Sequence, residues 1–552
     1  MEGGEVQADD ASVGSPAPPG ERRADRYVVA MLCGAAMVLA SVATRGGPGL
    51  TIDSIQYMSS GINIAESRGW LLLADQPLTI YAPGLPLIAA FGEAIGIGAE
   101  AMLHVLSVAS FGAIVLLGHK LLSRSVPLRG VVLGATALLA VSPTLLEVTT
   151  MAWSEPPFMV VVLTYLLVLG RVVDRRELGR LDLAALATLC WIAFLLRYAG
   201  VILIVLGVIG LLLALRPLNG RTLVRIGLLG AITSALPMGW VLRNHAVDGT
   251  LLGHRSDSND SLGDSLYRVA STFGTWMLPG SGAATRSLAL VGVAAMLLAL
   301  VGLIVASGRG PGVQRTVLAF GTASGWLLGC AGFVVLYLAY MIAASLYTSF
   351  EPLGTRYLFP VSVPGVVVAA AGLSALLRVT TEPRWRVMVA ALPLLLIVVH
   401  LTAALDDVRT SARDGIGFNT SGYVDSELAA EAKRLIQSSD DAVVYSNQPF
   451  GLWAATRLQP IRWSPRSIGF RGASLEGELD RLVREVGCTS MRTFLIRYRY
   501  GDARAMSLAE IRTVIDVTRV TVADDGAIFE LTAEEQPRCP ADSALPQATK
   551  VR

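Results

Sequence analysis

The stretch GGPGLTIDSIQYMSSGINIAESRGWLLLADQPLTIYAPGLP, Gly46–Pro86, determines how the rest of the chain is interpreted. It follows an apolar run, Tyr27–Thr44, that is long enough to cross a bilayer. A carboxylate, Asp53, stands shortly after this run and begins a segment with helical spacing. A Tyr-Ala-Pro-Gly turn then leads into a second apolar run. The segment is therefore predicted to be a polar loop at a membrane surface.

The composition excludes an ordinary soluble protein. Of the 552 residues, 53% are hydrophobic and only 16% are charged, and the mean hydropathy is +0.56. The charged residues occur in short bursts between apolar runs, which is typical of a polytopic α-helical membrane protein. The net charge of +2 gives no indication of nucleic-acid binding, because the basic residues lie beside the apolar runs.

The basic residues define a topology. Cytoplasmic loops of membrane proteins carry an excess of Lys and Arg. The basic clusters are Glu21–Arg26, His119–Arg129, Arg171–Arg180, Arg216–Arg225, Arg309–Arg315 and Arg378–Arg386. All of them fall on the cytoplasmic side if the chain crosses the membrane about eleven times, with the N-terminus inside and the C-terminus outside. The predicted spans are Tyr27–Thr44, Ala101–Leu122, Gly130–Leu145, Glu155–Val172, Leu181–Leu196, Val201–Leu215, Val224–Leu242, Ser287–Ser307, Thr316–Leu346, Tyr357–Leu377 and Val387–Leu405.

Three parts of the chain follow from this topology. Residues 1–26 are predicted to be a disordered cytoplasmic tail, and residues 27–405 a transmembrane domain in a plasma membrane. Its outer loop, 45–100, contains an apolar run, Leu87–Gly98, that is too short to span and is predicted to be an interfacial helix. Residue 243 to residue 286 is predicted to be a polar outer loop.

Residues 406–552 are predicted to be a small extracytoplasmic α/β domain. Its expected elements are helices at Asp425–Gln437 and Leu508–Val514, strands at Ala442–Tyr445 and Thr493–Arg497, and a hairpin of Arg519–Val522 with Ala527–Leu531. Cys488 and Cys539 can pair there if the domain is exported. Cys33, Cys190 and Cys330 lie in apolar runs as expected of buried free thiols, and no cysteine has metal-ligand spacing.

Polar residues gather near the predicted outer ends of the spans. They are Asp53, Tyr57, Tyr81, Glu155, Arg197, Tyr198, Arg243, Asn244, Arg356 and Tyr357. Outward arginines on different spans oppose the usual charge bias and therefore suggest a function. Simpler interpretations remain open: Asp53 could cap a helix or lie in solvent, and Glu155 could stabilise the N-terminus of a span that begins with two prolines. His245 and His254 lack a carboxylate partner and are poor candidates for metal binding.

The order of these motifs resembles the GT-C superfamily of membrane glycosyltransferases. The matching residues are Asp53-x-x-x-Tyr57, Tyr81-Ala-Pro-Gly-Leu-Pro86, Ser154-Glu155-Pro156, Arg243-Asn244 and Arg356-Tyr357. The similarity is to the branch that uses polyprenyl-phosphate sugars, which includes protein O-mannosyltransferases and lipid A aminoarabinose transferases. It extends over the membrane part, and some members also carry a trailing outer α/β domain.

The resemblance implies an inverting sugar transfer from a polyprenyl-phosphate donor to a hydroxyl of a lipid, glycan or protein. Asp53 would be the general base at the acceptor and Glu155 a second active-site carboxylate. Arg243 and Arg356, with Arg197 as a third candidate, would hold the donor phosphate. Tyr57, Tyr81 and Tyr357 would contact the sugar, with Tyr198 and Asn244 as further substrate-binding candidates.

The chain departs from the family pattern at two positions. Several relatives carry a second acidic residue directly after the first-loop Asp, where this chain has Ser54. Some carry a metal-binding carboxylate before the proline of the second interfacial helix, where this chain has Tyr81-Ala82-Pro83. We therefore predict no cofactor and no metal, although a divalent metal occurs in the family.

Other classes of protein remain as alternatives. A transporter or flippase of lipid-linked saccharides would favour mid-span charges and duplicated halves, whereas these charges lie at outer ends and the sequence shows no internal repeat. A polysaccharide polymerase or ligase would rely on a large loop late in the chain. An assembly scaffold would keep its role when Asp53 is replaced.

Overall fold

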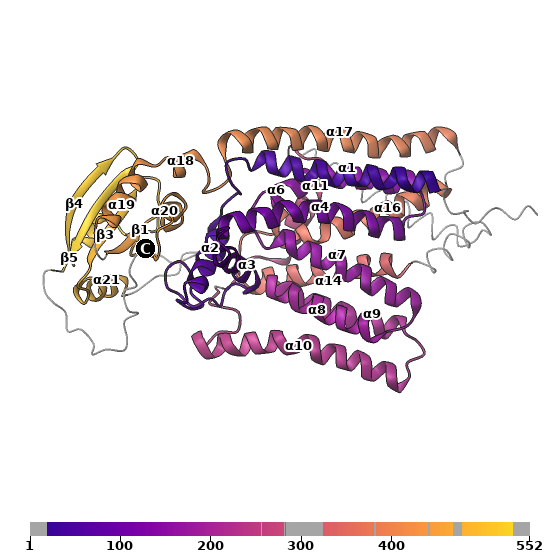
Figure 1. Cartoon of the computed structure of the whole chain (residues 1–552), viewed down its shortest axis with the longest axis horizontal. Helices are drawn as coiled ribbons and strands as arrows, with labels where there is room; N and C mark the ends of the chain where they lie inside the picture. Colours follow the sequence, from indigo (N-terminus) through magenta and orange to yellow (C-terminus); the bar gives the residue numbers. More distant parts are fainter. Residues whose placement is uncertain are drawn as a thin grey trace, which may run out of the picture.

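The computed structural model describes residues 19–255, 257–280, 282, 324–379, 382–439, 442–466 and 477–533. Long helices lie roughly side by side in a bundle, and a small sheet with its helices lies beyond one end of that bundle (Figure 1). The two short helices of the first loop lie between the bundle and the sheet (Figure 1).

The helices of the bundle and its loops follow the apolar periodicity of the sequence. In chain order they are α1 (Pro19–Ala43), α2 (Ile52–Ala65), α3 (Gly84–Ala94), α4 (Ala99–Ser125), α5 (Arg129–Ala140), α6 (Pro143–Thr149), α7 (Glu155–Arg175), α8 (Arg180–Leu196), η1 (Tyr198–Gly200), α9 (Val201–Ala214), α10 (Gly220–Asp248), α11 (Leu262–Met277), α14 (Gly325–Tyr347), α15 (Thr355–Leu358), η2 (Phe359–Val361), α16 (Ser362–Val379) and α17 (Pro383–Asp414).

Among the described residues, six helices are long and apolar enough to cross a membrane, or seven if α5 and α6 form one span bent by 43°. The sequence predicted about eleven spans. Two of the expected spans form helices of only 17 residues (α8) and 14 residues (α9). The expected span Ser287–Ser307 lies outside the described residues. The multi-pass character is confirmed, and the number eleven stays a prediction.

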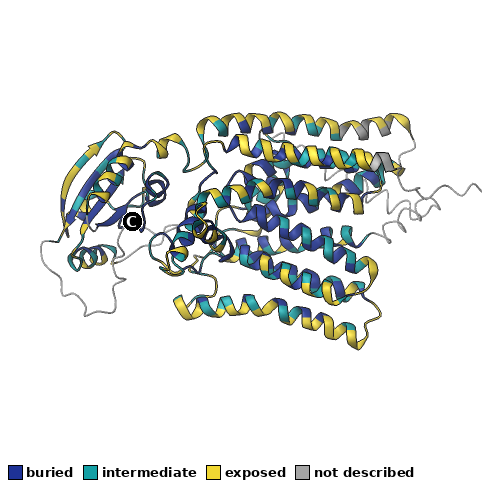
Figure 2. Cartoon of the chain, in the orientation of Figure 1, coloured by how far each residue is buried: buried dark blue, intermediate teal, exposed yellow. Residues whose placement is uncertain are grey.

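The outer surface of the bundle is apolar, as a bilayer requires. Helices α10 and α17 are exposed along most of their length, whereas α7 is largely buried (Figure 2). The exposed side chains include Val224 on α10 and Val387 on α17, which are 70% and 68% exposed. A contiguous apolar surface of this kind would be unfavourable in water, and it identifies the faces that contact lipid.

Four of the basic clusters are connected in pairs at one end of the bundle, within the part of the chain that the structure describes. Arg129 at the start of α5 forms an ion pair with Asp25 of α1, at 2.7 Å. Arg225 of α10 donates a hydrogen bond to the carbonyl of Leu178, between α7 and α8. The first loop and its partners lie at the opposite end. A separation of this kind between basic residues and the first loop is the pattern from which the positive-inside rule assigns an orientation.

Two predictions for the helical part are wrong in detail. Helix α1 already begins at Pro19, so the predicted tail 1–26 is helical in its last part, where Glu, Arg and Ala favour helix; residues 1–18 lie outside the described residues. The predicted polar loop 243–286 contains α11. A capping box of Ser261 and Asp264 starts this amphipathic helix, whose buried face packs on α14.

The C-terminal part contains a five-stranded mixed sheet in the order β2-β1-β3-β5-β4. Its strands are β1 (Ala442–Ser446), β2 (Arg462–Trp463), β3 (Arg492–Tyr498), β4 (Asp516–Ala523) and β5 (Gly526–Thr532), and its helices are α18 (Ser421–Val424), α19 (Glu427–Gln437), α20 (Pro449–Thr456), α21 (Glu478–Gly487) and α22 (Leu508–Ile511). Strand β1 is parallel to β2 and β3, while β5 is antiparallel to β3 and β4. The predicted strands and hairpin are confirmed, and so are the two helices, although the helix expected at Leu508–Val514 ends at Ile511.

The sheet is joined to the bundle by a continuous core. One face of the sheet, with α19 and α20, belongs to the same buried apolar cluster as the helices, while the other face packs against α21. Arg457 after α20 forms an ion pair with Glu100 of α4. The predicted boundary between the parts at 405/406 falls inside α17, which continues to Asp414.

A short backbone ladder fixes the first loop between two distant segments. Gly49 forms a parallel bridge with Met151, and Leu50 forms one with Gly417. The amide of Phe418 donates to the carbonyl of Leu50 at 2.8 Å. The bridged residues lie just before α2, just before α7 and at the start of residues 417–423. The ladder therefore sets the positions of these three segments relative to one another.

Gly417→Ala tests the ladder. Gly417 has φ +63°, and an added Cβ would collide with the Leu50 carbonyl. We expect the substitution to lower the free energy of unfolding by about 1–3 kcal/mol. Gly422→Ala is the matched control, since nothing lies within 4 Å of its Cβ position. Thermal unfolding in detergent measures both, and equal stability of the two variants would contradict the ladder's role.

Candidate functional site

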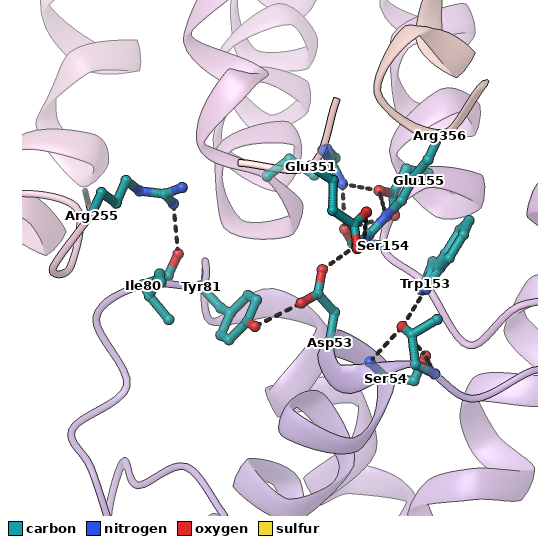
Figure 3. A network of polar contacts seen from close by, with 12 residues as sticks. Asp53, Ser54, Ile80, Tyr81, Trp153, Ser154, Glu155, Arg255, Glu351 and Arg356 are labelled. Atoms are coloured by element: carbon teal, nitrogen blue, oxygen red, sulfur yellow. Dashed lines mark hydrogen bonds and ion pairs between the residues drawn. The ribbon is translucent and has the colours of Figure 1, made fainter. Parts of the chain in front are cut away.

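Asp53 lies in the first turn of α2 and does not cap it. Thr51 is the N-cap, in a capping box with Ser54, so the interpretation of Asp53 as a helix cap is wrong. The carboxylate is instead held by side chains from elsewhere (Figure 3). Its Oδ1 accepts a hydrogen bond from the Tyr81 hydroxyl at 2.7 Å, and its Oδ2 forms an ion pair with the Arg356 guanidinium.

Glu155 begins α7 and is fully buried, with no exposed side-chain surface. Its Oε1 lies 2.5 Å from Nη1 of Arg197 and 2.8 Å from Nε of Arg356. Arg197 also donates to the hydroxyl of Ser154, at 3.0 Å. A carboxylate at a helix N-terminus is favourable by itself. Stabilising the N-terminus of α7 does not require two buried guanidinium groups, so this simpler interpretation does not account for Arg197 and Arg356.

Arg356 connects the two carboxylates. It lies at the start of α15 and contacts Asp53 and Glu155 at once (Figure 3). Its guanidinium carbon lies 4.4 Å from the centre of the Trp153 ring and 5.5 Å from that of Tyr357, in cation–π contact. Only 11% of its side chain is exposed. Residues 53, 155 and 356 therefore form one charge cluster at the end of the bundle that carries the first loop.

The tyrosines complete this cluster as neutral groups. The ring of Tyr57 packs edge-on against Tyr81 at 5.2 Å. Burial raises the pKa of both phenols, and the nearby Asp53 carboxylate raises them further. Tyr81 thus stays protonated, and its hydroxyl donates a hydrogen bond to Asp53.

Tyr198, Arg243 and Asn244 lie in a second cluster that holds the first loop by its backbone. Arg243 donates to the carbonyl of Leu78 at 2.7 Å, and Tyr198 donates to those of Thr79 and Tyr81 at 2.7 and 3.0 Å. Asn244 bonds the Tyr198 hydroxyl at 3.2 Å. The structure does not bring these three residues to Asp53, and they position the segment that carries Tyr81.

Several residues of the cluster were not predicted from sequence. Trp153 donates to the capping Thr51 hydroxyl at 2.8 Å while its ring contacts Arg356. Glu351 lies 3.6 Å from Arg356 and is 67% exposed. Phe418 and Tyr423 line a cavity of 360 Å³ together with Asp53, Glu351 and Arg356. Trp153 is adjacent to the Ser154-Glu155-Pro156 motif and could have been inferred from it; the other three carry no sequence signal.

The carboxylates of the cluster are paired with side-chain donors and are not grouped with one another as metal ligands. Both oxygens of Asp53 and one oxygen of Glu155 are engaged by Arg and Tyr donors. Across the described part of the chain, no three His, Cys, Asp or Glu side chains are grouped as metal ligands. The positive charge beside the carboxylates is supplied by guanidinium groups, and the expectation of metal-independent action stays a prediction.

The apolar helices and the charge cluster together define a class: the chain is a multi-pass membrane protein with a buried charge cluster at one end of its helical bundle. No protein-family model and no curated protein matches the sequence. Solved structures do match its fold.

ArnT from Cupriavidus metallidurans is one such structure. Its crystal structure bound to undecaprenyl phosphate matches with a TM-score of 0.56 and 12% identity, over 92% of this chain and 98% of that one. The apo structure of ArnT gives a TM-score of 0.58. The arabinofuranosyltransferase AftD from Mycobacteria matches with a TM-score of 0.52 and 14% identity, over 92% of this chain and 41% of AftD.

Glu155→Ala tests the charge cluster. It would leave the buried guanidinium groups of Arg197 and Arg356 without their shared carboxylate. We expect the free energy of unfolding to fall by about 3–5 kcal/mol. Glu351→Ala is the control, because its exposed side chain lies 3.6 Å from Arg356, and we expect a change below about 1 kcal/mol. Chemical or thermal unfolding in detergent measures both changes. An unchanged free energy of unfolding in Glu155→Ala would refute the claim that Glu155 is charged and paired with the two arginines.

Proposed function

We propose that this protein is a glycosyltransferase that moves a sugar from a polyprenyl-phosphate donor to an acceptor hydroxyl at the extracytoplasmic face of the membrane. The observation that carries the proposal is the contact of Arg356 with both Asp53 and Glu155 at one end of a GT-C bundle. The match to ArnT bound to undecaprenyl phosphate supports a lipid phosphate as the ligand of the same fold.

Asp53 is proposed as the general base. It is the carboxylate of the cluster that also lines the cavity, and 21% of its side chain is exposed. The acceptor hydroxyl gives its proton to Asp53, and its oxygen attacks the anomeric carbon of the donor sugar. The bond from that carbon to the phosphate oxygen breaks, and the polyprenyl phosphate leaves with the electron pair. Attack opposite the phosphate inverts the anomeric configuration.

Arg356 and Arg197 are proposed to stabilise the leaving phosphate. The donor is a phosphodiester with one negative charge, and it becomes a phosphate monoester with a second charge as the glycosidic bond breaks. Guanidinium groups bind phosphate through paired hydrogen bonds. When the donor phosphate binds Arg356, Asp53 loses its ion-pair partner, and its Oδ2 is free to accept the proton of the acceptor hydroxyl. Glu155 keeps both arginines charged and in place. The residues proposed for the sugar itself are Tyr57, Tyr81 and Tyr357, next to the carboxylates.

The orientation rests on the charge distribution. The basic end of the bundle is proposed to be cytoplasmic, which puts the N-terminus inside and the cluster and sheet outside. Cys488 beside α21 is disulfide-bonded, which agrees with an oxidising compartment; the predicted partner, Cys539, lies outside the described residues. A flippase is not favoured, because the cluster lies at the end of the spans and not at mid-depth.

Asp53→Asn tests the base. The substitution keeps the size of the side chain and removes its ability to accept a proton, so we expect transfer to fall about 10²–10⁴-fold with unchanged binding of the lipid donor. Transfer is measured with a panel of radiolabelled polyprenyl-phosphate sugars and membrane extracts as acceptor.

Glu66→Gln at the other end of α2 is the matched control, since Glu66 is paired only with the nearby Arg68, and we expect normal transfer. Near-normal transfer by Asp53→Asn would exclude Asp53 as the base.

A further inference from the structure

The cavity beside Asp53 has one wall that does not come from the bundle. Its 360 Å³ falls within the range of small-molecule sites, about 300–1,000 Å³. Asp53, Glu351 and Arg356 form the wall on the bundle side. The opposite wall is residues 417–423, which follow α17 and lead into the C-terminal sheet. A molecule in this cavity touches the proposed base on one side and the C-terminal part on the other.

The opposite wall is aromatic and fixed in place. The rings of Phe418 and Tyr423 contact each other edge-on at 5.0 Å, and Tyr500 packs on Tyr423 at 5.8 Å. Gly451 of α20 lies against the Tyr423 ring, where an added Cβ would come within 2.6 Å of two ring carbons. Both cavity-lining rings are half-buried. Their ring surfaces offer an apolar contact to a ligand without a large loss of side-chain freedom.

Once the proposed donor phosphate occupies Arg356, the charges around the cavity disfavour a second anion. Three carboxylates are paired with only two guanidinium groups here. The carboxylates are Asp53, Glu155 and Glu351, and the guanidinium groups are those of Arg197 and Arg356. The excess carboxylate is Glu351, which is 67% exposed at the cavity. An acceptor that carried phosphate would be repelled there, whereas hydroxyl groups can donate hydrogen bonds to the carboxylates.

We propose that this cavity is the acceptor subsite and that it takes a neutral carbohydrate. The inference rests on the proposed function, because it needs Asp53 as the base. Sugar rings combine apolar C–H faces, which pack on Phe418 and Tyr423, with hydroxyl groups, which suit Asp53 and Glu351. The prenyl chain of the donor stays in the bilayer and must approach between helices, so the wall built by the C-terminal part is left to the acceptor.

A binding experiment on the purified full-length chain tests this. The probes are an array of neutral oligosaccharides, the same oligosaccharides as phosphate monoesters, and peptides containing Ser and Thr. We expect binding to neutral saccharides only. Tyr423→Ala should weaken it about tenfold, whereas Tyr423→Phe should bind normally because the ring remains. Tyr267→Ala is the control, since Tyr267 on α11 is 69% exposed and does not line the cavity.

Glu351→Gln provides a second arm that does not depend on the stability of Tyr423→Ala. Removing the excess charge should admit the phosphorylated saccharides while leaving the neutral ones bound. The inference is overturned if neutral saccharides fail to bind, if their binding is the same in Tyr423→Ala, if the wild type prefers peptides or phosphorylated saccharides, or if Glu351→Gln still rejects the phosphorylated ones.

Binding of undecaprenyl phosphate to the same preparations separates the two proposals. If the wild type and Tyr423→Ala both bind the lipid while the array results fail, the acceptor inference is wrong and the proposed function stands. If the wild type does not bind the lipid, the proposed function itself fails.

Discussion

The contact of Arg356 with Asp53 and Glu155 is the interaction on which the rest of the site depends. A fully buried carboxylate is unfavourable without partners, and Glu155 finds them in Arg356 and Arg197. Since Arg356 also reaches Asp53, the need to neutralise one buried charge fixes three segments that are far apart in sequence. The bridge between Gly49 and Met151 also fixes two of these segments, those that carry Asp53 and Glu155, through their backbones. The ion pairs and the backbone bridge thus act together to position Asp53 and Glu155.

This arrangement explains how a site whose arginines are already paired with carboxylates can accept the proposed charged donor. In the structure, Asp53 is bonded by both Arg356 and Tyr81. Asp53 accepts a single hydrogen bond from Arg356, whereas the proposed donor phosphate can accept paired hydrogen bonds from its guanidinium. In the proposed reaction, the loss of the Arg356 contact leaves an oxygen of Asp53 free for the acceptor hydroxyl while the donor is bound. The raised pKa of Tyr81 keeps that residue a neutral donor, so it does not compete for the proton of the acceptor.

The sequence identified the parts of the site that follow from topology. Asp53, Glu155, Arg197 and Arg356 share one end of the bundle because each stands at the end of a span, and alternation of spans puts those ends together. The sequence could not show that Arg243 lies apart from these residues, because a hydrogen bond to a backbone carbonyl, such as that of Leu78, has no sequence signature. Phe418 and Tyr423 were missed because a non-periodic segment after a long helix predicts nothing about where it packs. Helix α11 was missed because its polar first turn resembles a loop.

The most direct test of the account is the affinity of the purified protein for undecaprenyl phosphate, measured on the wild type, Arg356→Lys and Arg243→Lys. Lysine keeps the charge but cannot form the paired contacts of a guanidinium. The account predicts about a tenfold loss of affinity in Arg356→Lys and none in Arg243→Lys, whose guanidinium holds the Leu78 carbonyl. Unchanged affinity in Arg356→Lys would contradict the account.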